Sequence, residues 1–146
     1  MSNTLYINGK WSTPIEGHTW DVISPADGRV VATVAEGTGA DVELAINAAR
    51  TAFDKGEFPN WGFEKRAALV GKIADLMERD LKILAKLESD DTGKRLVEAE
   101  YDIADVIACF RHFAEIGKKQ HEREVNVGMD HIDSRVVHEP VGVCTL

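Results

Sequence analysis

The chain has 146 residues, of which 44% are hydrophobic and 29% charged, and its net charge is −8 at pH 7. This length and composition are typical of one soluble globular domain with a hydrophobic core. The acidic balance, without a Lys/Arg cluster, excludes nucleic acids and anionic membranes as expected partners. No apolar run approaches the roughly 20 residues that span a bilayer, and the N-terminus lacks a secretory signal, so we expect a cytoplasmic protein.

Short β-rich segments occupy the first third of the chain. Leu5 to Trp11 predicts a hairpin around Asn8-Gly9, the strongest two-residue turn signal. Trp20 to Ile23 and Val30 to Val34 predict two more strands, separated by a turn that contains Pro and Gly. Together they indicate a short antiparallel meander, which is too thin to be stable unless it packs on the elements that follow.

Three helical patterns come next. The first opens at Thr38, with Asp41 in capping-box position, and its apolar face consists of Val42, Ala45, Ile46, Ala49 and Phe53. The second runs from Glu64, and we expect its inward residues to be Leu69, Val70, Ile73, Leu76 and Met77. Asp80 could cap a new helix before Leu81, Leu84 and Leu87, so this stretch is either one helix or two that meet at a bend.

The third helix is predicted over Leu96 to Lys119, with Ile103, Val106, Ile107, Phe110, Phe113 and Ala114 buried. After a polar, turn-prone stretch, Ser134 to His138 predicts a strand that Pro140 interrupts. Val141 to Leu146 then has the composition of a buried strand of a parallel sheet. This order of elements is compatible with α+β or α/β.

The joint between the second and third helical patterns is the most informative stretch. Asp91-Thr92-Gly93-Lys94 predicts a helix end, because Gly93 can adopt the left-handed conformation. Lys94 would place a cation near the unpaired carbonyls there. The next helix carries acids in its first turns, at Glu98, Glu100, Asp102 and Asp105. The residues therefore predict a helix–turn–helix joint with an acidic surface.

Four segments resemble the NAD(P)-dependent aldehyde dehydrogenases in the right order. They are Tyr6 to Trp11, Ile23 to Gly28 (with Ser24 where the family has Asn), Leu87 to Lys94, and His138 to Val143. The resemblance implies an α/β fold, with a β-meander, long helices and the start of a Rossmann-like sheet. It places the N-terminal part of the cofactor-binding domain in residues 1–121, the start of an oligomerisation arm in 122–140, and a truncated strand returning to the first domain in 141–146.

The resemblance also implies a function for the complete protein, which would oxidise an aldehyde with NAD or NADP and form a homo-oligomer. In the family a Cys thiolate attacks the aldehyde, hydride passes to the nicotinamide and water cleaves the thioester. The corresponding catalytic and cofactor-binding groups lie beyond Leu146, so we expect the chain alone to be an inactive N-terminal fragment. The alternative is a non-catalytic module that pairs through an exposed sheet edge; an apolar C-terminus favours the fragment.

Tyr101, Asp102 and Asp105 are the candidate substrate-binding residues. The two acids are three apart on a helix and so share a face, which on its own is typical of a solvated acidic stripe. The segment resembles the tunnel-lining helix of aminoaldehyde and betaine aldehyde dehydrogenases. That resemblance implies that the acids attract a cationic substrate and that Tyr101 offers its ring to an ammonium group.

Val22, Ile23 and Asp91 are the candidate metal ligands. The resemblance implies a structural K⁺ or Na⁺ held by main-chain carbonyls at these positions, since hard cations accept carbonyl oxygens. The alternative is that Asp91 merely ends a helix. Cys109 and His112 could meet on a helix, but without a second pair we expect Cys109, like Cys144, to be a buried structural residue.

Overall fold

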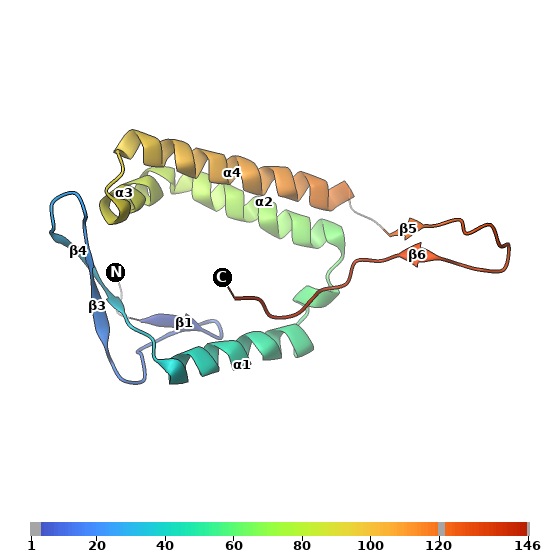
Figure 1. Cartoon of the computed structure of the whole chain (residues 1–146), viewed down its shortest axis with the longest axis horizontal. Coiled ribbons are helices and arrows are strands. Elements are labelled where there is room, and N and C mark those ends of the chain that lie inside the picture. The colour runs from blue at the N-terminus through green and yellow to red at the C-terminus, as the bar shows by residue number, and fades with distance from the viewer. Residues whose placement is uncertain (1–3, 120–121, 146) are drawn as a thin grey trace.

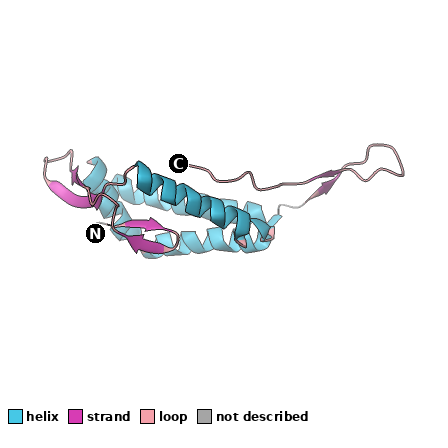
Figure 2. Ribbon diagram, turned by 90° about the horizontal axis from the view of Figure 1, so that it is seen from below, coloured by secondary structure: helices cyan, strands magenta, loops and turns pink. Residues whose placement is uncertain are grey.

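A computed structural model describes residues 4–119 and 122–145. Helices α2, α3 and α4 lie together on one side, while α1 and the first hairpin lie on the other (Figure 1). The second hairpin connects these two parts at one end of the molecule, and the C-terminal hairpin projects from the opposite end. Figure 2 shows the projecting C-terminal hairpin from below. The chain combines helices with small antiparallel sheets, in keeping with the expected α/β fold.

The N-terminal strands form two separate hairpins. β1 (Leu5–Ile7) pairs with β2 (Lys10–Ser12), and Asn8 and Gly9 both have positive φ, at 52° and 75°, as the predicted two-residue turn requires. β3 (Thr19–Ile23) pairs with β4 (Val30–Ala35). The expected single meander is wrong, because among the described strands β2 does not pair with β3.

The reason for this separation is a contact from the loop between the hairpins to α1. The backbone N–H of Ile15 donates to Asp41 Oδ1 at 3.0 Å. This hydrogen bond holds the segment between β2 and β3 against the start of a helix. The two strands are therefore not free to continue as one sheet.

Helix α1 (Gly39–Lys55) begins with the predicted capping box. Asp41 Oδ2 accepts from the backbone N–H and the hydroxyl of Thr38, at 2.9 and 3.0 Å. The carboxylate is buried, and these hydrogen bonds, led by that of the Thr38 N–H, lower the pKa of Asp41. A single carboxylate thus caps the helix and anchors the preceding loop.

The next helical stretch is two helices, which answers the question that the sequence left open. After a 3₁₀ turn (Phe58–Asn60), α2 (Phe63–Arg79) and α3 (Leu81–Thr92) meet at Asp80. The Asp80 side chain makes no capping hydrogen bond to α3; it pairs instead with Arg79. The bend therefore comes from the backbone at Asp80, whose ψ of 10° departs from helical values.

Helix α4 (Leu96–Lys119) has the predicted bounds and packs along α2 and α3. The buried residues at this contact are small, apart from one isoleucine: Ala67, Ala74, Ala85, Ala99, Ile107 and Ala114. A Cβ on Gly117 would lie 3.3 Å from the Cβ of Ala67, so the backbones approach closely. The core of the helical layer is thus a seam of small side chains.

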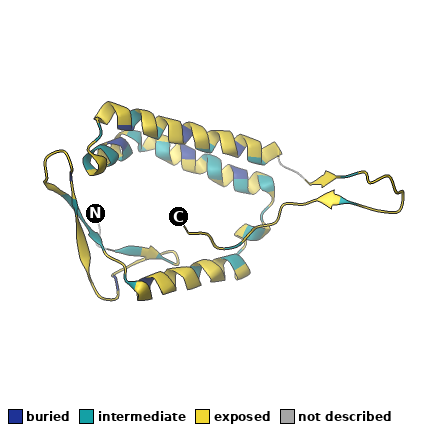
Figure 3. Ribbon diagram, in the orientation of Figure 1, coloured by how far each residue is buried: buried dark blue, intermediate teal, exposed yellow. Residues whose placement is uncertain are grey.

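Several residues that we expected to be inward are exposed instead (Figure 3). They are Val42, Ala45, Ile46, Ala49, Leu69, Ile73, Leu76, Leu87, Val106 and Phe113. In α2, α3 and α4 the close approach of the helices explains the difference, because the small residues occupy the contact and displace the larger ones to its margins. The exposed residues of α1 have another reason: this helix lies apart from the helical layer and packs mainly on β1 and the 3₁₀ turn.

The C-terminal part contains less strand than the sequence predicts. β5 (Arg123–Glu124) pairs with β6 (Arg135–Val136) in a long-looped hairpin, so the strand expected over Ser134 to His138 is shorter. Residues 141–145 form no strand, and Leu146 lies outside the described residues. No described strand runs beside 141–145 to supply the hydrogen bonds that a ladder needs.

We predict that the Asp41 carboxylate protects the amides of Ile15 and Thr38 from hydrogen exchange. Because its folded-state pKa lies below the unfolded value, this stabilisation is complete above about pH 4 and is lost as the pH falls through the folded pKa. At neutral pH, NMR-detected exchange should show severalfold lower protection of both amides in Asp41→Asn than in wild type. In wild type the protection should fall at acid pH, whereas in Asp41→Asn it should not fall further. The control Glu43→Gln, exposed on the same helix, should behave as wild type; equal protection in Asp41→Asn would contradict the assignment.

Candidate substrate and cation sites

The joint between α3 and α4 is a tight left-handed turn, as the sequence predicts. Gly93 has φ 75°, and its N–H donates to the Ser89 carbonyl at 3.0 Å. The Ser89 hydroxyl in turn donates to the Lys94 carbonyl at 2.8 Å. A Cβ on Gly93 would lie 2.8 Å from Pro25 Cγ, so the joint also packs against the β3–β4 turn, where only glycine fits without a shift.

The ammonium of Lys94 makes contacts that the sequence did not predict. It pairs with two carboxylates, Glu88 of α3 at 2.7 Å and Asp102 of α4. These hydrogen bonds, with Asp102 first and Glu88 next, raise the pKa of Lys94 well above its usual range. Helical spacing rules could not find this cluster, because it spans a turn rather than one helix face.

The three candidate substrate-binding residues lie on α4 and are all exposed. Tyr101 is 69% exposed, and Asp102 is held by Lys94. Of the other acids near the start of α4, Glu98 pairs with Arg95, and Glu100 pairs with Lys82. Among the described residues, Asp105 alone of these four acids has no ion-pair partner. Asp102 and Asp105, the two predicted substrate-binding acids, are thus both exposed on α4 but lie in unequal electrostatic surroundings.

Two of the three candidate cation ligands line one pocket. Val22 of β3 and Asp91 of α3 face a cavity of about 440 Å³ between the second hairpin and the end of α3. Glu88 and Asp90 also line it, whereas Ile23 is not part of its wall. Asp90 is tied to Lys86 and Arg29, which lower its pKa.

The main chain at these positions lies at a ladder irregularity and at a helix end. The β3–β4 ladder shifts register between Val22 and Ile23, and such irregularities leave ladder groups unpaired. Asp91 lies in the last turn of α3, where helix carbonyls have no partner further along the helix. These features are compatible with a carbonyl-lined cation site, which is the kind of site that the resemblance implies.

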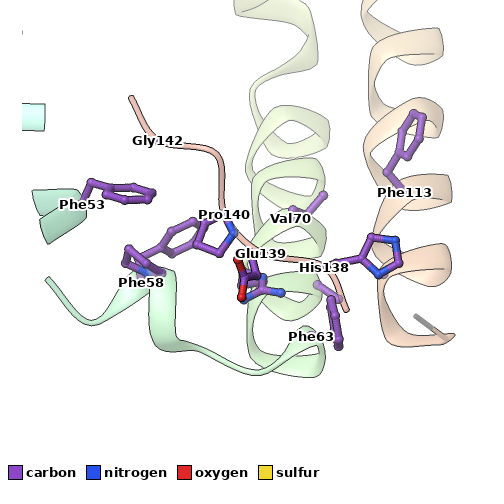
Figure 4. A pocket seen from close by; sticks show the side chains of 13 residues that line it. Phe53, Phe58, Phe63, Val70, Phe113, His138, Glu139, Pro140 and Gly142 are labelled. Atoms are coloured by element: carbon purple, nitrogen blue, oxygen red, sulfur yellow. The ribbon is translucent and has the colours of Figure 1, made fainter. Parts of the chain in front are cut away.

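A further pocket, of about 430 Å³, was missed at the level of sequence. Aromatic residues from α1, the 3₁₀ turn, α2 and α4 line it, and the C-terminal segment lies across it (Figure 4). His138, Glu139 and Pro140 come from that segment. The aromatic residues near Phe58 could have indicated an apolar site in the sequence. They could not show that a segment some 80 positions later returns to them.

The described part of the chain has neither a buried cysteine nor a metal-binding cluster. Cys109 and Cys144 are both exposed, so their expected burial is wrong. Within residues 4–119 and 122–145, no cluster of three or more His, Cys, Asp or Glu side chains could hold a metal ion. No helix in the same part of the chain is long and apolar enough to cross a membrane.

Comparison with known proteins supplies the family context for these sites. A sequence model described as "Aldehyde dehydrogenase family" matches residues 11–146. A betaine aldehyde dehydrogenase of Bacillus subtilis is 40% identical over 144 residues, which are 99% of this chain and 29% of the relative. The mitochondrial aldehyde dehydrogenase X of Bos taurus is 42% identical over 144 residues, and the match covers 97% of this chain and 28% of the bovine protein.

Solved structures show the same relationship. A betaine aldehyde dehydrogenase from Staphylococcus aureus, crystallised in complex with NAD⁺, superposes with a TM-score of 0.89 at 37% sequence identity. The match covers 95% of this chain and 28% of that protein. The chain therefore spans less than a third of the length of the proteins that it matches.

Proposed function

Because the chain belongs to the aldehyde dehydrogenase family, we propose that it is the N-terminal part of an enzyme that oxidises an aldehyde to a carboxylic acid with NAD. The family match over residues 11–146 carries this proposal. The NAD⁺ bound in the similar Staphylococcus aureus enzyme supports the choice of dinucleotide. When bound, NAD supplies the hydride acceptor, and we assign no catalytic role to the residues of this chain.

What this chain contributes is attraction of the substrate. Asp102 and Asp105 are three positions apart on α4 and both are exposed, as is Tyr101 on the same helix. Carboxylates and an aromatic face both stabilise an ammonium group. The substrate we propose is therefore a cationic aldehyde such as betaine aldehyde, and the match to a betaine aldehyde dehydrogenase supports this substrate class.

The complete enzyme should lose its preference for a cationic substrate when both acids are replaced. The probes are betaine aldehyde and 3,3-dimethylbutanal, a neutral aldehyde of nearly the same shape. We expect Asp102→Asn/Asp105→Asn to raise the ratio of their KM values, cationic over neutral, about fivefold or more, as expected for the loss of charge attraction. NADH formation measures both KM values.

The control for this experiment is Glu43→Gln, which removes one exposed carboxylate on α1 and should leave the ratio within about twofold of wild type. An equal change of both KM values would contradict the role of the acids. If the natural polypeptide has a mass of 16.1 kDa and forms no NADH with any aldehyde, the catalytic proposal fails and a non-catalytic interaction module is favoured.

We also propose that the carbonyls of Val22, Ile23 and Asp91 bind a structural monovalent cation. The register shift in β3, the carbonyl end of α3 and the shared pocket support this assignment. A cation there would join the second hairpin to the α3–α4 joint. Such a site selects oxygen ligands rather than particular side chains, so it needs no acidic cluster.

Removal of the cation should destabilise the complete enzyme. We expect a lower Tm in N-methylglucamine chloride than in KCl at equal ionic strength, because the bound ion stabilises only the folded state. Anomalous scattering from crystals soaked in rubidium should locate the ion beside Val22 and Asp91. Equal Tm values in the two salts, or a rubidium peak elsewhere only, would contradict the site.

A further inference from the structure

Lys94 connects the acidic surface of α4 to α3 through side chains alone. Its Nζ donates to Glu88 Oε1 at 2.7 Å and also to Asp102 Oδ2. Only 32% of the Lys94 side chain is exposed, against 50% for Asp102. The ammonium therefore lies partly enclosed between two carboxylates that belong to different helices.

The backbone fixes the point from which the Lys94 side chain projects. Lys94 directly follows Gly93, whose left-handed turn packs against Pro25, and its carbonyl accepts from the Ser89 hydroxyl. Both contacts orient the peptide from which the side chain projects. The two carboxylates then hold the ammonium at the end of its flexible stem.

The charges near the start of α4 are consequently unequal. Glu98, Glu100 and Asp102 each have a basic partner, which is Arg95, Lys82 and Lys94, respectively. Asp105 has no such partner among the described residues. A nearby opposite charge offsets the attraction that a carboxylate exerts on a third group, so Asp105 presents the larger uncompensated charge.

We propose that Lys94 is a positioning residue that fixes Asp102 and offsets its charge, so that Asp105 is the main attractor of a cationic aldehyde. This inference rests on the proposed function, because it assigns unequal roles to the two acids of the same surface. It makes Lys94 a determinant of substrate specificity that acts through Asp102. Lys94 itself does not touch the substrate.

The test uses the complete enzyme and the same pair of probes, betaine aldehyde and 3,3-dimethylbutanal. We expect Asp105→Asn to raise the ratio of KM values, cationic over neutral, about fivefold, and Asp102→Asn to raise it less than about twofold. Lys94→Met should lower the ratio, since it uncovers Asp102. In that background, Asp102→Asn should raise the ratio about fivefold.

Lys94→Arg is the matched control, because it keeps the positive charge. The ratio of KM values should stay near that of wild type in this variant. A lysine with a purely structural role would not predict that the charge alone restores the ratio. Equal effects of Asp102→Asn and Asp105→Asn would overturn the inference while leaving the acidic surface intact. An Asp102→Asn effect that is the same with and without Lys94 would also overturn it.

The outcomes separate this inference from the proposed function. If no replacement changes the ratio, the acids do not select the substrate, and both proposals fail. If Lys94→Met does not fold, the two single aspartate variants still decide, since both residues are exposed on α4. Unequal effects, with Asp105 dominant, support the role of Lys94.

Discussion

The left-handed turn at Gly93 is the constraint on which the described sites depend. It ends α3, points Lys94 towards α4 and brings the joint against Pro25 of the β3–β4 turn. Asp91, which lines the pocket beside β3, and Lys94, which pairs with Asp102 on α4, flank this turn. A positive φ of 75° with a neighbour 2.8 Å from a would-be Cβ leaves glycine as the residue that fits.

A seam of small residues determines the rest of the helical layer. α2 and α4 approach closely because alanines and glycines lie where they meet, as at Ala67 and Gly117. Larger apolar side chains are left at the margins, and many are exposed. Hydrophobic periodicity therefore identified the helices correctly, and it found Ile107 and Ala114 at their contact but not the four other alanines. Periodicity locates an apolar face and does not show which of its side chains a neighbour covers.

Local signals in the sequence predicted most of the elements. The Asn8-Gly9 turn, the Thr38–Asp41 capping box and the bounds of α4 needed only neighbouring residues, and all three are confirmed. The failures concern long-range pairing. Residues 141–145 have strand composition but no described partner strand, and the two hairpins stay apart because Ile15 is held by Asp41. The Lys94 cluster and the Phe58 pocket were likewise out of reach, since each joins residues across turns or distant segments.

Hydrogen–deuterium exchange on the complete enzyme with Gly93→Ala tests the central role of the joint most directly. Gly39→Ala is the control, because Gly39 begins α1 with open space around it. We expect Gly93→Ala to speed exchange both in residues 24–29, at the β3–β4 turn, and in residues 94–102, at the start of α4, while the control changes neither. Unchanged exchange in both segments would contradict the account, because it would mean that the left-handed turn does not hold the hairpin and the acidic helix together.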